Sequence, residues 1–484
     1  MRVLHVAAEI FPLIKTGGLA DVVGALPQAQ IDTGTDTRIL LPGLPAILEG
    51  LDDLKPLITL GPAFGAAVLT LRRGRLPGSR VVVYVIDAPF LYRRPGNPYL
   101  GPDGHDWSDN HRRFALLGWT AAHIAAGELD PDWVPDIVHA HDWHAGLAPA
   151  FIAQNPALST GTVFTIHNLA FRGLFPLGSY PDLGLPAHKL TPQGLEFHGQ
   201  ISFLKAGLIY SKSITTVSPT YAREICTPEF GWGLDGVLRD RQQHLSGILN
   251  GVDTAIWDPN RDPHLAKTFN PARMTGKVAC KEALQAEYGL PQNERALLLS
   301  VVSRLSGQKG LDLVLGAIAE IIASGSQLIV LGTGEPELEH RWRALAAAHP
   351  ATIAVHIGYD EARSHRIIAG ADVMLVPSRF EPCGLTQLYA LRYGTLPLVR
   401  RVGGLADTVI DADPENLAAG TATGFVFRDA SSPALAARLH EAAELFKDKK
   451  RWKALQKTAM AQDFSWTGAA RHYNALYAGL VGRG

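Results

Sequence analysis

The chain has 484 residues, too many for one hydrophobic core, so two domains are expected. Hydrophobic residues make up 46% and charged residues 19%, as in a soluble globular protein, and the formal net charge is −1. A charge so close to zero gives no general attraction to nucleic acid or a membrane surface, and neither partner is expected. Three separated cysteines, no signal peptide and no apolar run of ~20 residues predict a cytoplasmic protein.

The first half of the chain alternates short apolar runs with helical patterns, which predicts a parallel, doubly wound α/β sheet. A helix is predicted at 114–125, and 61–65 and 95–104 indicate loops or hairpin excursions. The predicted strands are 3–7, 38–41, 81–86, 137–139, 163–166, 215–217 and 248–249.

The second half repeats this alternation after a segment at 257–274 that is rich in Pro, Asp and Asn and indicates an interdomain connection. Its predicted strands are 296–302, 328–331, 353–357, 373–376, 396–399 and 425–427, and its predicted helices are 311–322, 364–369, 435–460 and 466–480. We therefore expect a domain at 1–250, a linker at 251–275, a second domain at 276–460 and a helix within 461–484. Ligand sites are expected where the strands of both sheets end, facing a cleft between the domains.

The sequence Lys-Thr-Gly-Gly-Leu-Ala-Asp at 15–21 joins the first predicted strand to a helix. Gly17 and Gly18 let the backbone approach a ligand closely, and the N–H groups of the first helical turn attract anions. Lys15 adds a positive charge, and Asp21 could accept a hydrogen bond from a sugar hydroxyl. Gly-Gly-Leu-Ala-Asp recurs at 403–407, where no anion site is assumed.

Two groups of residues in the second half follow predicted strands. Arg304 offers phosphate oxygens a planar guanidinium, and Lys309 offers them a compact positive charge. A Gly-Thr-Gly turn at 332–334 follows the next predicted strand. Glu381 lies at the mouth of a helix, where a carboxylate can accept hydrogen bonds from sugar hydroxyls. Cys383 could be a nucleophile, but no partner base is evident, so a packing or hydroxyl-contact role is preferred.

Histidines end two neighbouring strands of the first half. His139 and His141 alternate onto the same side of their strand, which suits a metal site, but no cluster of carboxylates or thiols completes it, so no metal is expected. His167, beside Asn168, is the better candidate for contacting a reacting sugar.

Taken together, these segments resemble bacterial and plastid glycogen/starch synthases, the glucosyltransferases that extend α-1,4-glucan from a nucleotide sugar. The resemblance spans essentially the whole chain. One departure is Val402, which stands before the second Gly-Gly, at 403–404, where the family commonly has Thr. The segments that carry it are 9–22, 139–147, 165–169, 250–253, 303–310, 357–360 and 378–387.

The resemblance implies a glycosyltransferase B fold, which has two Rossmann-like domains facing a central cleft, and a last helix that crosses back to the first domain. It implies ADP-glucose as the usual donor, glycogen or malto-oligosaccharide as acceptor, and no cofactor or metal. It also implies catalytic roles for His167, Arg304, Lys309 and Glu381. The implied donor-binding residues are Lys15, Gly17, Gly18, Asp21, Asn250, Tyr359, Cys383, Gly384, Leu385 and Thr386, and those on the acceptor side are Asp142, Trp143 and Asn168.

Within these roles, Arg304 and Lys309 would grip the donor diphosphate, Tyr359 would stack on the base, and His167, Asn250 and Glu381 would hold glucose hydroxyls. UDP-glucose stays open as the donor because Tyr359 would stack on either base. A nicotinamide oxidoreductase should show Gly-x-Gly-x-x-Gly after its first strand, where this chain has Lys-Thr-Gly-Gly. A glucan phosphorylase would need a Schiff-base lysine for pyridoxal phosphate, and a non-catalytic glucan-binding protein would lose the charged residues.

Overall fold

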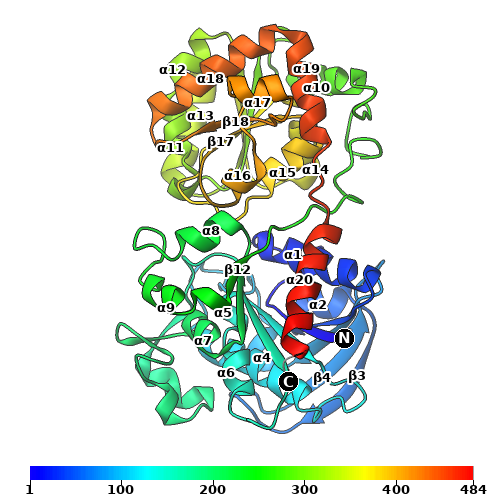
Figure 1. Cartoon of the computed structure of the whole chain (residues 1–484), viewed down its shortest axis with the longest axis vertical. Coiled ribbons are helices and arrows are strands. Elements are labelled where there is room, and N and C mark those ends of the chain that lie inside the picture. Colours follow the sequence, from blue (N-terminus) through cyan, green and yellow to red (C-terminus); the bar gives the residue numbers. More distant parts are fainter. Residues whose placement is uncertain (483–484) are drawn as a thin grey trace. The chain divides into compact units, whose positions relative to one another are not determined.

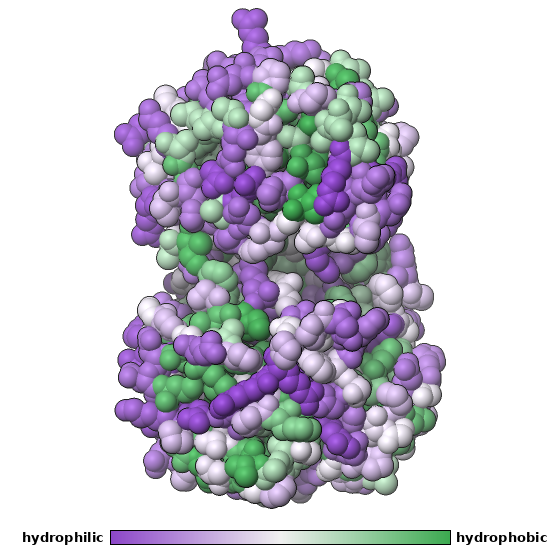
Figure 2. All heavy atoms as spheres, turned by 180° about the vertical axis from the view of Figure 1, so that it is seen from behind, coloured by the Kyte–Doolittle hydropathy of each residue, from purple (hydrophilic) through white to green (hydrophobic). Residues whose placement is uncertain are grey.

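The computed structural model describes residues 1–482 and divides into two compact units (Figure 1). Unit 1 comprises Met1–Gly251 together with the C-terminal segment that begins at Trp466, and unit 2 comprises Val252–Ser465. On the face seen in Figure 2, hydrophobic residues lie in small groups between hydrophilic ones. None of the helices within residues 1–482 combines the length and apolar character that crossing a bilayer requires.

Unit 1 is built on a nine-stranded sheet in the order β12-β11-β7-β6-β1-β2-β5-β4-β3. The pairs from β12 to β5 are parallel, as predicted, whereas β4 and β3 join the edge as an antiparallel hairpin. The strands are β1 (Arg2–Val6), β2 (Asp36–Pro42), β3 (Asp52–Leu60), β4 (Leu69–Arg75), β5 (Val82–Asp87), β6 (Ile137–His141), β7 (Gly161–Ile166), β11 (Ser213–Thr216) and β12 (Leu245–Gly247).

Two differences from the predicted strands have clear physical causes. The hairpin of β3 and β4 was not predicted, because β3 is largely exposed and carries no buried apolar run, although its connection at 61–65 is a loop as expected. The strand predicted at 248–249 is wrong, since β12 ends at Gly247. Ile248 is apolar because it packs beneath the C-terminal helix, in a cluster with Trp466 and Tyr473.

Helices cover both faces of this sheet. One face packs against α1 (Gly18–Asp32) and α20 (Trp466–Val481), which lie side by side in Figure 1. The other face packs against α4 (Asn110–Ala125), predicted at 114–125, and α6 (Leu147–Ile152). The shorter elements of unit 1 are α2 (Pro45–Gly50), α3 (Pro89–Tyr92), α5 (Asp142–Ala145), α7 (Phe203–Tyr210), α8 (Pro219–Glu224), α9 (Asp235–Asp240), β8 (Leu174–Pro176), β9 (Glu196–Phe197) and β10 (Gln200–Ser202).

Unit 2 has a six-stranded parallel sheet in the order β15-β14-β13-β16-β17-β18, which is the doubly wound 3-2-1-4-5-6 arrangement. All six strands were predicted, and the observed ones are β13 (Leu298–Val302), β14 (Gln327–Gly332), β15 (Ile353–Ile357), β16 (Val373–Val376), β17 (Leu396–Arg400) and β18 (Phe425–Phe427). Its helices are α10 (Thr275–Glu287), α11 (Leu311–Gly316), α12 (Ile318–Ala323), α13 (Pro336–Ala348), α14 (Glu361–Gly370), α15 (Thr386–Arg392), α16 (Gly403–Thr408), α17 (Pro414–Ala419), α18 (Ser432–Lys447) and α19 (Lys449–Met460).

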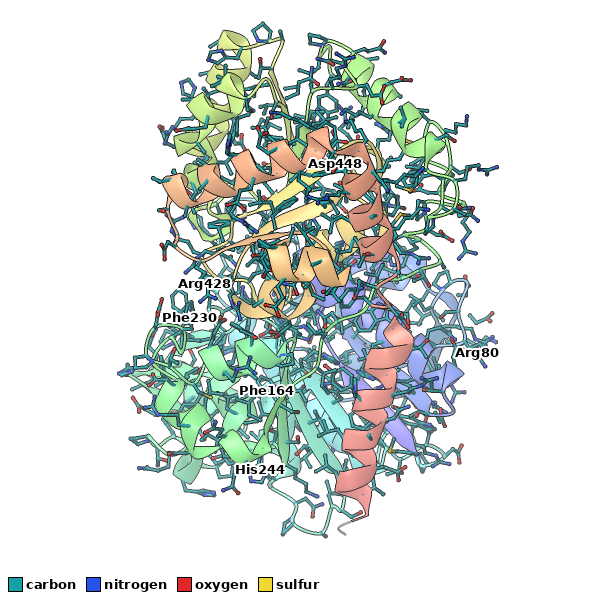
Figure 3. All side chains as sticks on the ribbon, turned by 45° about the horizontal axis from the view of Figure 1, so that its top comes forward. Arg80, Phe164, Phe230, His244, Arg428 and Asp448 are labelled. Atoms are coloured by element: carbon teal, nitrogen blue, oxygen red, sulfur yellow. The ribbon has the colours of Figure 1, made fainter. Side chains whose placement is uncertain are left out.

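Two helices predicted as continuous are each divided. The pattern at 311–322 forms α11 and α12, and that at 435–460 forms α18 and α19. Asp448, labelled in Figure 3, separates the second pair, because its carboxylate accepts hydrogen bonds from the backbone N–H groups of Lys450 and Arg451 and so caps a new helix. Apolar periodicity continues through such a break, so the sequence pattern alone does not reveal it.

The segment in which the sequence indicates an interdomain connection packs onto unit 2. Trp257 and Phe269 are buried in the core of that unit, and the Trp257 ring stacks on those of His365 and Tyr389 with centroids 3.7 and 3.8 Å apart. Asp262 accepts hydrogen bonds from His365 and from the Tyr393 hydroxyl. Aromatic anchors therefore fix an irregular stretch of chain that has no helical or strand period.

Candidate active site

In unit 1, the sheet changes winding direction between β1 and β6, and predicted site residues follow both strands. In parallel sheets this position beyond the carboxyl ends of the strands is where ligands bind. Gly17 is the N-cap of α1, and a Cβ built there would meet nothing within 4 Å, so the backbone borders open space. The Nζ of Lys15 lies 2.9 Å from Oδ1 of Asp21, which brings these two predicted residues into one ion pair.

Glu9 supports this loop from beneath and was not predicted as a site residue. It is 2% exposed and accepts hydrogen bonds from the Thr16 backbone N–H at 2.5 Å and from the Tyr99 hydroxyl at 2.7 Å. Burial raises the pKa of Glu9, an effect opposed by the hydrogen bonds from Thr16 and Tyr99. The feature of the sequence that could have identified Glu9 is a charged residue placed shortly before the Lys-Thr-Gly-Gly turn.

The residues predicted on the acceptor side gather where β6 and β7 end. Asp142 is buried, has a positive φ of 59°, and its pKa is raised well above the usual value by burial. Trp143 packs edge-on against Phe114 with ring centroids 4.9 Å apart. Asn168 Oδ1 accepts a hydrogen bond from the Ala170 N–H, which shapes the turn after β7.

Asn250 follows β12 at the same edge of the unit 1 sheet. It is 6% exposed, and in the part of the chain that the structure describes its Oδ1 is buried without a hydrogen-bond partner. Buried polar atoms are nearly always satisfied, so an unpaired acceptor at a strand end suits a ligand hydroxyl.

In unit 2, the corresponding change of direction lies between β13 and β16, and charged residues follow both strands. Lys309 Nζ lies 2.7 Å from Glu381 Oε2, which also accepts a hydrogen bond from Ser378 Oγ at 2.8 Å. Arg304 is exposed, and its Nη2 donates to Gln308 Oε1 at 3.3 Å. The structure therefore joins the predicted cation at 309 to the predicted carboxylate at 381.

The turn after Glu381 is shaped by one buried glutamine. Gln387 Nε2 donates to the carbonyl oxygens of Cys383 and Gly384, both at 2.9 Å. Gly384 has φ +72°, and a Cβ there would lie 2.3 Å from the Gln387 side chain, so this position requires glycine. Cys383 is buried, Leu385 packs against the core of unit 2, and Thr386 begins α15.

The repeated Gly-Gly-Leu-Ala-Asp sequence has different roles in its two copies. Gly404 donates its N–H to the carbonyl oxygens of Glu381 and Pro382, at 3.1 and 3.2 Å. A Cβ on Gly403 would lie 1.9 Å from the Glu381 carbonyl oxygen. The second copy therefore holds the Glu381 turn, whereas Gly17 in the first borders open space. Val402, the departure from the family pattern, is the buried N-cap of α16 and supplies no side-chain hydrogen bond there.

Tyr359 follows β15 and is 68% exposed, an unusual environment for a large aromatic ring. Its hydroxyl donates to the Glu361 carboxylate, and a ring this exposed suits stacking on a flat ligand.

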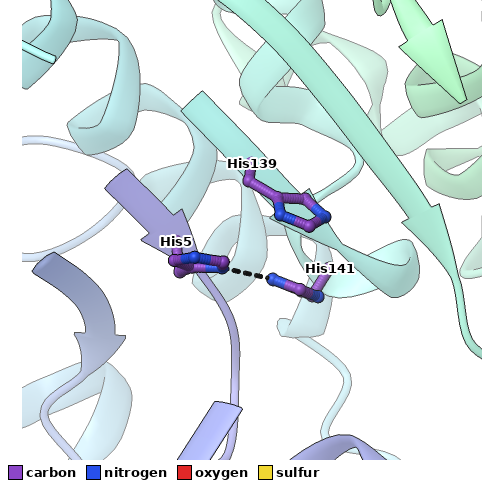
Figure 4. A group of neighbouring side chains, drawn as sticks. All are labelled: His5, His139 and His141. Carbon is purple, nitrogen blue, oxygen red and sulfur yellow. Dashed lines mark hydrogen bonds between the residues drawn. The ribbon is translucent and has the colours of Figure 1, made fainter. Parts of the chain in front are cut away.

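The histidines of β6 form a buried group with His5 of β1, which the sequence analysis missed (Figure 4). His139 and His141 lie on one side of their strand, as predicted, and each of the three offers a nitrogen within 4.8 Å of the others. The His5 Nδ1 and His141 Nε2 atoms are 2.8 Å apart and hydrogen bonded, whereas two nitrogens on a tetrahedral zinc ion are ~3.3 Å apart. In the described structure this group therefore fits a hydrogen-bond network better than a metal.

Comparison with known proteins agrees with this geometry. The model of the starch synthase catalytic domain matches residues 2–240, and that of glycosyl transferases group 1 matches residues 281–459. A glycogen synthase of Francisella tularensis subsp. novicida (strain U112) is 52% identical over 99% of both chains. A glycogen synthase of Francisella philomiragia subsp. philomiragia is 51% identical over 99% of this chain and 100% of its own.

Solved structures give the same result. The catalytic domain of starch synthase IV from Arabidopsis thaliana, bound to ADP and acarbose, matches with a TM-score of 0.90 and 32% identity over 99% of each chain. Sucrose-phosphate synthase from Thermosynechococcus elongatus matches with a TM-score of 0.59 and 17% identity, over 100% of this chain and 99% of its own, which shows a shared fold only. The predicted glycosyltransferase B fold is thus confirmed, and the chain belongs to the glycogen and starch synthase family of glycosyltransferases.

Proposed function

We propose that this protein transfers glucose from ADP-glucose to the O4 hydroxyl at the non-reducing end of an α-1,4-glucan, either glycogen or a malto-oligosaccharide. The observation that carries the proposal is the pairing of Lys309 with Glu381 where the unit 2 sheet changes direction. A cation suited to phosphate and a carboxylate suited to sugar hydroxyls adjoin there, as a nucleotide sugar requires.

Arg304 and Lys309 would bind the donor diphosphate. Negative charge grows on the departing ADP as the glucosyl–phosphate bond breaks, so cations placed there stabilise the transition state more than the ground state. Arg304 is exposed, and among the described residues its guanidinium donates only to Gln308, so this group can turn toward a ligand at little cost. Lys15 and the amides of Gly17 and Gly18, from unit 1, would approach the same diphosphate, with Asp21 at its ribose or phosphate region.

His167, Asn250 and Glu381 would hold the glucose hydroxyls, and Cys383, Gly384, Leu385 and Thr386 would line the pocket around them. The unpaired Oδ1 of Asn250 supports this role, because a sugar hydroxyl would satisfy it. The exposed ring of Tyr359 would stack on the adenine. Asp142, Trp143 and Asn168 would lie on the acceptor side.

We infer a retaining reaction by front-side attack. The bond from C1 to the β-phosphate oxygen breaks, the bond from C1 to the acceptor O4 forms on the same face, and the O4 proton passes to the leaving phosphate. A covalent route would need a free carboxylate nucleophile near C1. Glu381 already accepts hydrogen bonds from Lys309 and Ser378, which favours sugar binding over nucleophilic attack.

The decisive experiment measures labelled glucose incorporated into glycogen from ADP-glucose and, separately, from UDP-glucose. ADP in the starch synthase IV structure supports the adenine donor. We expect incorporation from ADP-glucose at a rate that a chelator does not change, since the proposed chemistry uses no metal and no cofactor. Incorporation only from UDP-glucose would overturn the donor assignment, and no incorporation from either would overturn the function. The cytoplasmic location stays a prediction.

A further inference from the structure

Three buried imidazoles and one buried amide form a continuous hydrogen-bonded chain inside unit 1. Gln30 Oε1 lies 2.7 Å from His5 Nε2, and His5 Nδ1 lies 2.8 Å from His141 Nε2, the contact drawn in Figure 4. His141 Nδ1 then lies 3.0 Å from His167 Nε2. Gln30, His5 and His141 are wholly buried and His167 is 9% exposed, so the chain leads from the interior to the predicted donor-sugar residue.

We name Gln30, His5 and His141 the histidine relay. Its members come from α1 and from the adjacent strands β1 and β6, and its last member, His141, contacts His167 just beyond β7. His5 is paired in register with His139, and His141 lies two residues further along the same strand, paired with Thr165. The side chains of His5, His139 and His141 therefore share one face of the sheet. Rigid central strands fix these rings far more firmly than a loop could.

The direction of the hydrogen bonds along this chain follows from the Gln30 amide. Its Nε2 donates to the Tyr477 hydroxyl oxygen at 3.2 Å, which turns Oε1, an acceptor, toward His5. A neutral imidazole has one donor and one acceptor nitrogen, so His5 donates from Nε2 and must accept at Nδ1. His141 therefore donates from Nε2 and accepts at Nδ1, which leaves His167 as the donor from Nε2.

The neutral state that this pattern requires agrees with the environment. Burial lowers the pKa of His5 to about 4 and that of His167 to about 3, and it lowers the pKa of His141 well below its usual value. A protonated imidazole would carry two donors and would break the chain at one contact. The Nδ1 atom of His167 has no hydrogen-bond partner among residues 1–482.

We propose that the histidine relay holds His167 in the Nε2–H tautomer, so that its Nδ1 presents a hydrogen-bond acceptor to a hydroxyl of the donor sugar. This proposal rests on the proposed function for the contact between His167 and the sugar. Gln30, His5 and His141 are positioning residues, since they act through His167. A neutral acceptor also suits an oxocarbenium-like sugar, because an imidazolium beside the developing positive charge would oppose its formation.

The first test reads the tautomer directly, without substrate, from nitrogen NMR of the protein labelled at histidine. A histidine in the Nε2–H form gives a pyridine-type Nδ1 and a pyrrole-type Nε2, and the signals are assigned with a His167→Gln variant. We expect His167 of the wild-type protein to show only this form. A wild-type signal from the Nδ1–H form, or from a mixture, overturns the proposal even if no variant folds.

The second test removes the first acceptor of the relay. Gln30→Met keeps the side-chain length and removes the amide, so His167 should show both tautomers, and kcat/KM for ADP-glucose should fall about tenfold, the value of one hydrogen bond. Gln30→Glu restores an acceptor oxygen and should recover the single tautomer and most of the activity. If His167 keeps one tautomer in Gln30→Met, the relay is overturned.

The matched control is Thr120→Val. The Thr120 hydroxyl is equally buried, but it donates to the Leu116 backbone carbonyl oxygen of its own helix α4 at 2.8 Å and not to a member of the relay. It should lower the melting temperature without changing the tautomer or kcat/KM. A shifted tautomer with unchanged kcat/KM in Gln30→Met would overturn the link from the relay to the sugar. Absence of glucose transfer by the wild-type protein would instead contradict the proposed function. The NMR test reads the tautomer of His167 without substrate, so its result would not depend on that outcome.

Discussion

The Nζ atom of Lys309 lies 2.7 Å from Oε2 of Glu381, although 72 positions separate the two residues. Their side chains are 19% and 7% exposed, so the pair is mostly removed from water. Each charge therefore depends on the other in the absence of ligand, and a diphosphate that attracts Lys309 would compete with Glu381 for it. Substitutions at either position should affect stability as well as turnover.

Lys309→Met should lower the free energy of unfolding by about 2 kcal/mol, because it leaves the Glu381 charge buried without its partner. It should also lower kcat at least about a hundredfold through loss of a phosphate contact. In the double variant Lys309→Met with Glu381→Gln, stability should recover while activity does not. Denaturant unfolding and the incorporation assay measure the two effects, and an additive loss of stability would show that the pair is not coupled.

Arg304→Ala should separate activity from stability. The side chain is exposed, so the free energy of unfolding should stay within about 0.5 kcal/mol of the wild-type value. Turnover should fall about a hundredfold or more, because negative charge on the departing diphosphate loses a cation. Arg343→Ala, an exposed arginine on α13, is the matched control and should leave turnover unchanged. A near-normal rate in Arg304→Ala would count against the assigned role.

Glu9→Ala should raise the KM for ADP-glucose about tenfold with a smaller change in kcat, because the Thr16 N–H then loses its acceptor and the glycine loop loses its support. Tyr99→Phe is the control, since it removes one hydrogen bond to Glu9 and leaves that to Thr16. It should change KM less than about threefold. Steady-state kinetics with varied ADP-glucose would decide, and equal effects of the two variants would contradict a role for the loop.

Tyr359→Ala should raise the KM for ADP-glucose about tenfold, since stacking on a base contributes roughly 1–3 kcal/mol. Tyr359→Phe should retain most of the affinity because the ring is kept. Phe90→Ala tests whether loss of any exposed aromatic has this effect, because Phe90 is 70% exposed on α3 of the other unit. An unaltered KM in Tyr359→Ala would remove this residue from the donor site.

Stability should fall as the pH drops from about 6.5 toward 4. Burial lowers the pKa of His5 from 6.5 to about 4, so in this window the unfolded chain binds a proton that the folded protein does not. His5 alone should contribute about 3 kcal/mol to this loss, and the lowered pKa values of His139, His141 and His167 act in the same direction.

Denaturant unfolding at pH 7.5 and pH 5 measures this loss. The difference between the two values should shrink in His5→Leu and stay the same in His105→Gln, since His105 is exposed. An equal pH dependence in His5→Leu and the wild-type protein would show that His5 does not supply the effect.

Local patterns in the sequence carried most of the architecture. Most residues in the strands of unit 2 are buried, so these strands read as mainly apolar runs, and 353–357, 373–376 and 425–427 match β15, β16 and β18 end to end. The edge strand β3 lacked such a run, and the break at Asp448 left the helical period intact.

For the candidate site, the sequence by itself determined the residue types and their positions at strand ends, because chain neighbours set both the burial of a strand and the turn that follows it. Only the tertiary structure decided which of these residues meet. Lys309 reaches Glu381, His5 reaches His141 across 136 positions, and Gln30 reaches Tyr477 across 447. Such contacts depend on strand order and on packing of the last helix, and no local pattern records a hydrogen bond between distant segments.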